Sequence, residues 1–230
     1  MMENPYSGVL EGDLEEYRSC KFNWDCENCT KHLCLTLVSA AKLPSLYGDF
    51  WIIGFANNKD NKDHIAVVKG DVKGRESVLT RLHSSCLTGD ALGSLRCDCG
   101  PQLHSALQLI EDEGLGVVLY MQQEGRGIGL VNKIKAYRLQ DMGFDTLDAN
   151  LHLGFEPDER DYEVSAAMLD KLEVRSVRLL TNNPEKVEQL RRFGVDIVER
   201  VPHEVPPQEH DRSYLETKKE RFGHKLRLDG

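Results

Sequence analysis

Apolar and polar residues alternate with different periods along this chain, and the periods predict two kinds of element. Short apolar or alternating runs bounded by turn residues predict strands at FWIIGFA, HIAVVKGD, VLTRLHSS, LGVVLYM, VRLLTNN and VDIVERV. The polar stretch NNKDNKD separates the first two runs and is expected to form a turn. The run VDIVERV closes this series of predicted strands.

Helical periodicity occupies the gaps between the later strands. Leu103, Ala106, Leu107 and Ile110 recur at i, i+3, i+4 and i+7, which predicts a helix that ends near Gly114. Start and stop signals predict further helices over 130–142, 161–172, 183–194 and 214–226. We therefore expect an α/β fold, a mixed sheet with flanking helices in which antiparallel N-terminal strands are followed by βα units.

Length and charge narrow the possible functions. The chain has 230 residues, enough for one substantial core or two small domains, and a net charge of −9. This charge argues against general attraction to nucleic acid or to an anionic membrane, but it allows a local basic pocket for a small anion. No apolar run approaches the length of a membrane span, and the acidic N-terminus lacks a signal-peptide core. We expect a cytoplasmic protein without nucleic-acid or membrane partners.

The first 36 residues differ from the rest, because they are polar and contain Cys20, Cys26, Cys29 and Cys34. Their spacing includes one CxxC pair but is otherwise irregular. Three interpretations of these cysteines therefore remain open: a structural zinc site, an iron–sulfur cluster and a flexible extension with free thiols. We expect an N-terminal extension over 1–36 and a main domain over 37–230.

The other three cysteines, Cys86, Cys97 and Cys99, lie in the segment CLTGDALGSLRCDCG. Cys97 and Cys99 are two residues apart, so an extended segment places both sulfurs on one face, and a loop can return Cys86 to the same point. Structural zinc sites usually have four protein ligands, whereas catalytic sites have three and leave a position for water. Three thiols thus favour a zinc ion that activates water.

Two other interpretations of these cysteines remain open on spacing alone. His83 lies three residues before Cys86 and is a possible fourth ligand of a closed structural site. The thiols are also compatible with burial as small apolar groups.

Two turns follow predicted strands and open predicted helices, the layout of an anion site. QQEGRGIGL has glycines at 125, 127 and 129, which let backbone amides approach an anion at a helix N-terminus. LTNNPEK has the same layout and places Lys186 on the first helical turn. Both turns also occur without a ligand, and Asp158 and Arg160 in FEPDERDYE are equally compatible with an ordinary charged loop.

Taken together, these segments resemble one family, GTP cyclohydrolase II of riboflavin biosynthesis. The matching stretches follow the family order and spacing over roughly residues 38–225: KLPSLYGDF, RLHSSCLTGDALGSLRCDCGPQL, QQEGRGIGLVNKIKAYRLQDMGFDTLDAN, LGFEPDERDY and VRLLTNNPEKV. The resemblance implies that the catalytic domain hydrolyses GTP to formate, pyrophosphate and 2,5-diamino-6-ribosylamino-4(3H)-pyrimidinone 5′-phosphate. It also implies one catalytic zinc per subunit, magnesium with the triphosphate, and a homodimer.

The resemblance further implies roles for individual residues. Cys86, Cys97 and Cys99 match the zinc ligands, Asp158 the proposed general base, Arg160 the proposed nucleophile, and Tyr137 a tyrosine near the purine. The residues that match substrate contacts are Arg81, Leu82, His83, Ser84, Ser85, Gln102, Glu124, Gly125, Arg126, Thr146, Thr181 and Lys186. Because the pKa of arginine exceeds about 12, a neutral nucleophilic arginine is chemically demanding. We expect Arg160 to be essential, either as a covalent nucleophile or as a phosphate clamp.

One departure from the family pattern concerns the nucleotide loop, where Gln122 stands at a position that is often arginine and removes a positive charge. Two alternatives to the full reaction remain. One is a divergent relative that stops at a formamidopyrimidine, and the other is a zinc-stapled nucleotide-binding or nucleic-acid-binding module. Tyr137 favours the full reaction, and the acidic composition disfavours the module. We expect no fused second riboflavin enzyme within these 230 residues.

Overall fold

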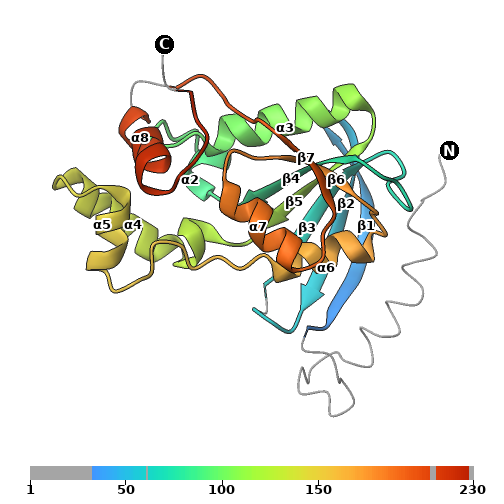
Figure 1. Cartoon of the computed structure of the whole chain (residues 1–230), viewed down its shortest axis with the longest axis horizontal. Helices are drawn as coiled ribbons and strands as arrows, with labels where there is room; N and C mark the ends of the chain where they lie inside the picture. Colours follow the sequence, from blue (N-terminus) through green and yellow to red (C-terminus); the bar gives the residue numbers. More distant parts are fainter. Residues whose placement is uncertain (1–32, 61, 208–210, 228–230) are drawn as a thin grey trace.

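The computed structural model of the chain describes residues 33–60, 62–207 and 211–227. Seven strands form a single sheet at its centre (Figure 1). They are β1 (Leu35–Ser45), β2 (Gly48–Asn57), β3 (His64–Lys69), β4 (Val78–Ser84), β5 (Gly116–Met121), β6 (Val177–Leu180) and β7 (Ile197–Val201). Their spatial order is β1-β2-β3-β5-β4-β6-β7. The pairs from β1 to β5 are antiparallel and those from β5 to β7 are parallel, which confirms the predicted mixed α/β sheet.

Helices connect the later strands, as the periodicity predicts. They are α2 (Leu87–Asp90), α3 (Cys99–Glu113), the 3-10 turn η1 (Glu124–Gly127), α4 (Leu130–Asp141), α5 (Thr146–His152), α6 (Glu163–Lys171), α7 (Pro184–Arg192) and α8 (Arg212–Arg221). The N-cap of α6 is Tyr162, one residue later than predicted, although the Asp161 carboxylate still accepts a 2.7 Å hydrogen bond from the Glu163 amide. The pattern did not single out β1 or α5.

The ends of α7 show why the sequence signals work. The side chain of Asn183 accepts a hydrogen bond of 2.9 Å from the Glu185 amide, and Pro184 occupies the first helical position, where no amide proton is needed. Gly194 follows the helix with φ of +87°, a left-handed conformation that glycine adopts without strain. Local side-chain chemistry therefore fixes where α7 begins and ends.

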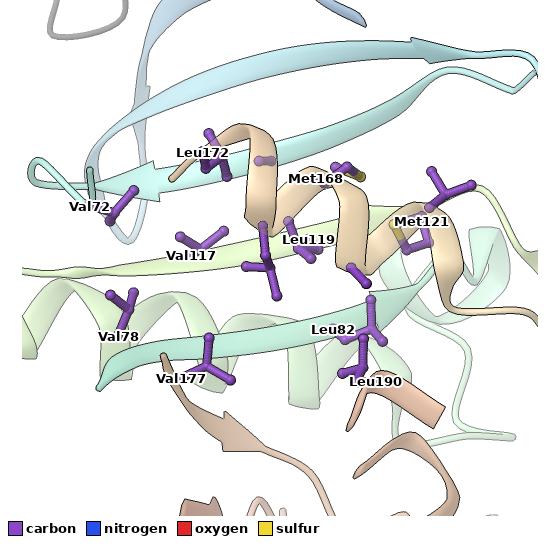
Figure 2. Close-up of a cluster of buried hydrophobic side chains, with 14 of the residues drawn as sticks. Val72, Val78, Leu82, Val117, Leu119, Met121, Met168, Leu172, Val177 and Leu190 are labelled. Carbon is purple, nitrogen blue, oxygen red and sulfur yellow. The ribbon is translucent and has the colours of Figure 1, made fainter. Parts of the chain in front are cut away.

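Both faces of the sheet are covered by helices. On one face, Ala106 and Ile110 of α3 pack against Leu79 and Val118. On the other, α6 and α7 pack over β4, β5 and β6, and Figure 2 shows Met168 and Leu172 above the strand that carries Val117 and Leu119. Coverage on both sides explains why β5 is a continuous apolar run and not an alternating one.

The parallel strands end at the same edge of the sheet, and the turns that follow them gather there. β4 leads into Cys86, β5 into η1, and β6 into the Thr181–Asn183 turn. Helices α4, α5 and α8 lie at this end of the molecule, at the left of Figure 1. Ligand sites of open α/β sheets form outside the carboxyl ends of the strands, so this edge is the expected position of a site.

Within the described residues no helix is both long and apolar enough to cross a membrane. The N-terminal cysteines Cys20, Cys26 and Cys29 lie outside the described residues, so a metal site and an extension with free thiols both stay open.

Candidate active site

The three cysteines of the central segment meet at the end of β4. Cys86 follows the strand, Cys97 precedes α3, and Cys99 is the first residue of α3. Their sulfurs all lie within 4.8 Å of one another, and those of Cys86 and Cys97 are 3.7 Å apart. Tetrahedral zinc with bonds of about 2.3 Å separates two sulfurs by about 3.8 Å. The donor set therefore fits zinc, and it is the only such group of metal-ligating side chains in the described ranges.

Gly89 leaves the space in which the sulfurs meet. A Cβ built on Gly89 would lie 2.9 Å from the Cys97 sulfur and 3.3 Å from the Cys86 sulfur. Both distances are shorter than ordinary van der Waals contact, so any side chain here would displace a thiol. Gly89 thus contributes to the site because it has no side chain.

His83 does not join the sulfur cluster, so the closed four-ligand site finds no support. Its Nε2 lies 3.1 Å from both carboxylate oxygens of Asp90. Asp90 also accepts hydrogen bonds from the Cys86 amide at 2.9 Å and from the Tyr120 hydroxyl at 2.9 Å. Burial, the largest influence, lowers the pKa of His83 and outweighs the opposing effect of Asp90. Asp90 therefore orients both His83 and the first cysteine.

The three thiols differ in their electrostatic surroundings. Hydrogen bonds from Cys97 and Cys99, supported by Lys133, hold the pKa of Cys86 far below its usual value. The hydrogen bond to Cys86 raises the pKa of Cys97 to about 11.

A cavity opens directly beside the cysteines. Its empty volume, including open solvent at the mouth, is about 1220 Å³. Its lining includes seven basic and two acidic side chains: Arg81, Arg96, Arg126, Lys133, Arg160, Lys186 and Lys218, and Asp98 and Glu124. An acidic protein has therefore concentrated positive charge in one hollow, which favours a polyanionic ligand.

Several buried polar atoms around this cavity have no partner among the described residues. They are Arg81 Nε, His83 Nδ1, Ser85 Oγ and Arg126 Nη1. A buried donor without an acceptor is costly, and such groups are rare unless a ligand or water completes them. Their position around a cationic hollow indicates a ligand with several acceptor oxygens.

Lys186 is, like Arg81, a buried cation of the cavity wall. Its Nζ donates to the carbonyl oxygen of Leu82 at 3.0 Å, and the residue is 6% exposed. Burial, followed by repulsion from Arg81 and Arg160, lowers the pKa of Lys186 well below its usual value. An anion bound between these three side chains would remove that repulsion.

Arg126 lies in the turn η1 in a strained backbone conformation. Its φ is +61°, and Gly125 and Gly127 beside it have φ of +63° and +99°. A non-glycine residue in this region costs free energy and is concentrated at functional sites. The guanidinium of Arg126 lies 3.9 Å from the centre of the Phe222 ring, so η1 contacts the segment after α8.

The structure brings the predicted site residues together at this cavity. All of them line it except Asp158 and Leu82. Asp158 accepts a hydrogen bond from the lining residue Arg160, and Leu82 buries its side chain in the core. Gln122 is exposed and is not among the lining residues, and its backbone amide donates to His64 Nδ1 at 3.1 Å.

Sequence analysis missed several lining residues. Asp98, between two of the cysteines, accepts a 2.6 Å hydrogen bond from Lys218 of α8, and Lys133 of α4 reaches the Cys86 sulfur. Tyr214, Phe222 and His224 of the tail also line the cavity. The position of Asp98 between Cys97 and Cys99 could have indicated from the sequence that it lies at the site. No local pattern marks a lysine that becomes buried only through tertiary packing.

Comparisons with known proteins agree with this site. A family model for GTP cyclohydrolase II matches residues 36–202. Riboflavin biosynthesis protein RibBA of Bacillus cereus (strain ATCC 14579) is 56% identical over 186 residues, 81% of this chain and 47% of that protein. RibBA of Bacillus mycoides (strain KBAB4) is 55% identical with the same coverage. The chain spans about half the length of these relatives.

A solved structure with a weak likeness is RibBX, a two-domain 3,4-dihydroxy-2-butanone 4-phosphate synthase from A. baumannii. It has a TM-score of 0.36 and 17% identity, over 66% of this chain and 35% of that chain. The sequence matches are far stronger, and the family match covers most of the described sheet and its connections. By these matches, this chain belongs to the GTP cyclohydrolase II family.

Proposed function

We propose that the chain hydrolyses GTP to formate, pyrophosphate and 2,5-diamino-6-ribosylamino-4(3H)-pyrimidinone 5′-phosphate. The observation that carries this proposal is the opening of the three-thiol cluster into a cavity lined by seven basic side chains. The thiols supply a metal site and the basic residues a place for a triphosphate. The proposal includes Mg²⁺ with the triphosphate, a homodimer, a cytoplasmic location, and a catalytic domain preceded by an extension.

Cys86, Cys97 and Cys99 would hold the zinc ion. When bound, zinc supplies activation of water at neutral pH and polarises the atom that water attacks. The chain's own residues keep the donor set ordered: Asp90 holds the Cys86 amide, and Gly89 leaves room for the sulfurs. The net reaction uses one water to open the C8–N9 bond, a second to release formate and a third to displace pyrophosphate.

The phosphates would lie against Arg81, Lys186 and Arg160. Arg81 donates from Nη1 to the Leu180 carbonyl at 2.9 Å and keeps its Nε buried without a partner. Burial lowers the pKa of Arg81 to about 10, so the guanidinium remains charged at neutral pH but lacks a full counter-charge. A triphosphate supplies that counter-charge, and the three cations stabilise the pyrophosphate that leaves.

Tyr137 would act near the base. Its hydroxyl lies 3.2 Å from Thr88 Oγ1, and the Arg96 guanidinium lies 4.6 Å from the centre of its ring. Burial raises the pKa of Tyr137, so its Oη holds a proton at neutral pH. That proton is available to a purine nitrogen whose bond to C8 breaks.

The test is mass spectrometry of the product formed from GTP and Mg²⁺, with formate and pyrophosphate quantified in the same samples. One sample is stripped with a zinc chelator and another is reloaded with zinc. The proposal expects equal amounts of formate and pyrophosphate, lost on stripping and restored by zinc. A product that retains the formyl group would identify the one-step relative, and GTP binding without turnover in the zinc-loaded protein would identify a binding module.

A further inference from the structure

Lys133 is a buried lysine that joins the cysteine cluster to the nucleotide loop. It belongs to α4, is 8% exposed, and has three partners. Its Nζ lies 3.0 Å from the Cys86 sulfur, 2.9 Å from Thr88 Oγ1 and 2.8 Å from Glu124 Oε1. An ammonium group has three protons, so these contacts use all of its donors and fix its position.

The partners of Lys133 belong to two separate segments. Cys86 follows β4 and Thr88 lies in the short helix α2, whereas Glu124 lies in η1 after β5. The second oxygen of Glu124 accepts a 2.7 Å hydrogen bond from the Leu87 amide. Lys133 and Glu124 contact each other, and each also contacts the segment 86–88, which we call the cysteine loop. These contacts hold the cysteine loop, η1 and α4 in one arrangement.

Lys133 also affects the net charge around the cysteine cluster. Three thiolates and one divalent ion sum to a charge of −1, and the Glu124 carboxylate, which lines the same cavity, adds another. A triphosphate must approach this negative centre. Lys133 is the cation in contact with both the sulfur and the carboxylate, so it offsets part of that charge where the metal would be held.

We propose that Lys133 is a positioning residue of the metal centre, which orients the Cys86 thiolate through an N–H···S hydrogen bond and thereby sets the affinity for zinc. The inference rests on the proposed function, because it takes the three cysteines to be the zinc ligands. Groups that hydrogen-bond to metal ligands typically change metal affinity by about 10- to 100-fold when they are removed. Lys133 makes such a contact from a separate helix.

The experiment measures the zinc dissociation constant of the full chain by competition with a chromogenic chelator. Lys133→Met removes the donors but keeps the stem, and it is expected to weaken zinc binding about 10- to 100-fold relative to wild type. Lys133→Arg keeps the charge but replaces three diverging donors with a planar fork, so an intermediate loss is expected. Lys135→Met, on the exposed side of the same helix, is the matched control and should bind zinc like wild type.

Glu124→Gln separates this role from a simple ion pair. It weakens the Lys133–Glu124 contact but leaves the contact with Cys86, so zinc affinity should fall by less than in Lys133→Met. Zinc affinity within twofold of wild type in Lys133→Met, or an equal loss in Glu124→Gln, would overturn the inference. If Lys133→Met does not fold by circular dichroism, the zinc affinity of Lys133→Arg is measured instead. An affinity within twofold of wild type in that variant would then overturn the inference.

The outcome is separable from the proposed function. A wild-type chain that binds no zinc overturns both the function and the role of Lys133. A wild-type chain that binds zinc and turns over GTP, with unchanged zinc affinity in the Lys133 variants, overturns only the inference.

Discussion

The guanidinium of Arg160 is bound at two points by the carboxylate of Asp158. Nε donates to Oδ1 at 2.7 Å and Nη2 donates to Oδ2, and the two side chains are only 12% and 13% exposed. Burial alone would lower the pKa of Arg160, but Tyr162 and Asp158 outweigh it and raise that pKa. Arg160 is therefore a fixed cation in this arrangement, which suits a phosphate clamp better than a nucleophile.

This geometry predicts the behaviour of Arg160→Lys. The variant is expected to lower kcat/KM for GTP by about 100-fold, because a lysine cannot hold Asp158 and a phosphate in the same fixed geometry. Wild-type protein quenched during turnover should show no covalently attached nucleotide in intact-protein mass spectrometry. Arg178→Lys, at a partly exposed ion pair with Glu113 outside the cavity lining, is the control and should leave activity near wild type. A GMP adduct on wild type that Arg160→Lys lacks would contradict the clamp.

Replacement of Lys186 is expected to have opposite effects on the stability of the fold and on GTP binding. Its folded pKa is lowered by burial and by Arg81 and Arg160, so its charge destabilises the native state at neutral pH. Lys186→Met is therefore expected to raise the free energy of unfolding by about 1 kcal/mol while weakening GTP binding at least 10-fold. Urea unfolding and nucleotide titration measure the two effects.

The pH dependence of this gain has a definite sign. Above the lowered folded pKa of Lys186, this group binds a proton in the unfolded chain that it does not bind in the native chain, so its destabilising contribution shrinks as pH rises toward about 10.5. Lys186→Met lacks this group, and its advantage should shrink as pH increases from 7 toward 10. An advantage that is constant or grows with pH would contradict the assignment of a buried, charge-destabilised lysine.

The fold was predictable where local chemistry determines it. Asn183 and Pro184 mark the start of α7, and Gly114 ends α3 with φ of +74°. The strand β1 was not singled out, because its sequence LTLVSAAKLPS has small and polar residues where a half-buried strand usually shows clean alternation. Its pairing with β2 along the whole hairpin, a tertiary effect, stabilises it.

The site was predictable where residues of unusual chemistry are close in sequence. Three cysteines within 14 residues are such a signal, and their sulfurs meet in the structure. Lys133 and Lys218 were not predictable in this way, because each lies among other charged residues on a helix that reads as a solvated surface. Only the packing of α4 and α8 over the strand ends turns these lysines inward.

The ion pair between Lys218 of α8 and Asp98 is expected to contribute to the free energy of unfolding. Its Nζ lies 2.6 Å from Asp98 Oδ1, and Asp98 is 2% exposed and also accepts a hydrogen bond from Gln102. Lys218→Met leaves the Asp98 charge buried with Gln102 as its remaining side-chain partner in the described chain, so unfolding free energy should fall by about 3 kcal/mol. Chemical denaturation of the zinc-loaded chain measures the change.

A double-mutant cycle tests whether the two residues act as a pair. Asp98→Asn combined with Lys218→Met should cost clearly less than the sum of the single changes, because neither charge is then left alone. Lys219→Met, exposed on the same helix, should change stability by less than about 0.5 kcal/mol. Strict additivity of the two single variants would show that the contact contributes nothing.

Gly89 offers the sharpest test of the metal site, because the change is a single methyl group. Its φ is not left-handed, so Gly89→Ala brings no backbone strain, yet the new Cβ would lie 2.9 Å from the Cys97 sulfur and 3.1 Å from the Cys99 Cβ. The sulfurs must then separate, and zinc affinity is expected to fall about 10-fold with the fold intact by circular dichroism. Gly54→Ala is the matched control, since no atom lies within 4 Å of its added Cβ. If Gly89→Ala binds one zinc per chain with wild-type affinity, the ion is not held by these three sulfurs in this arrangement.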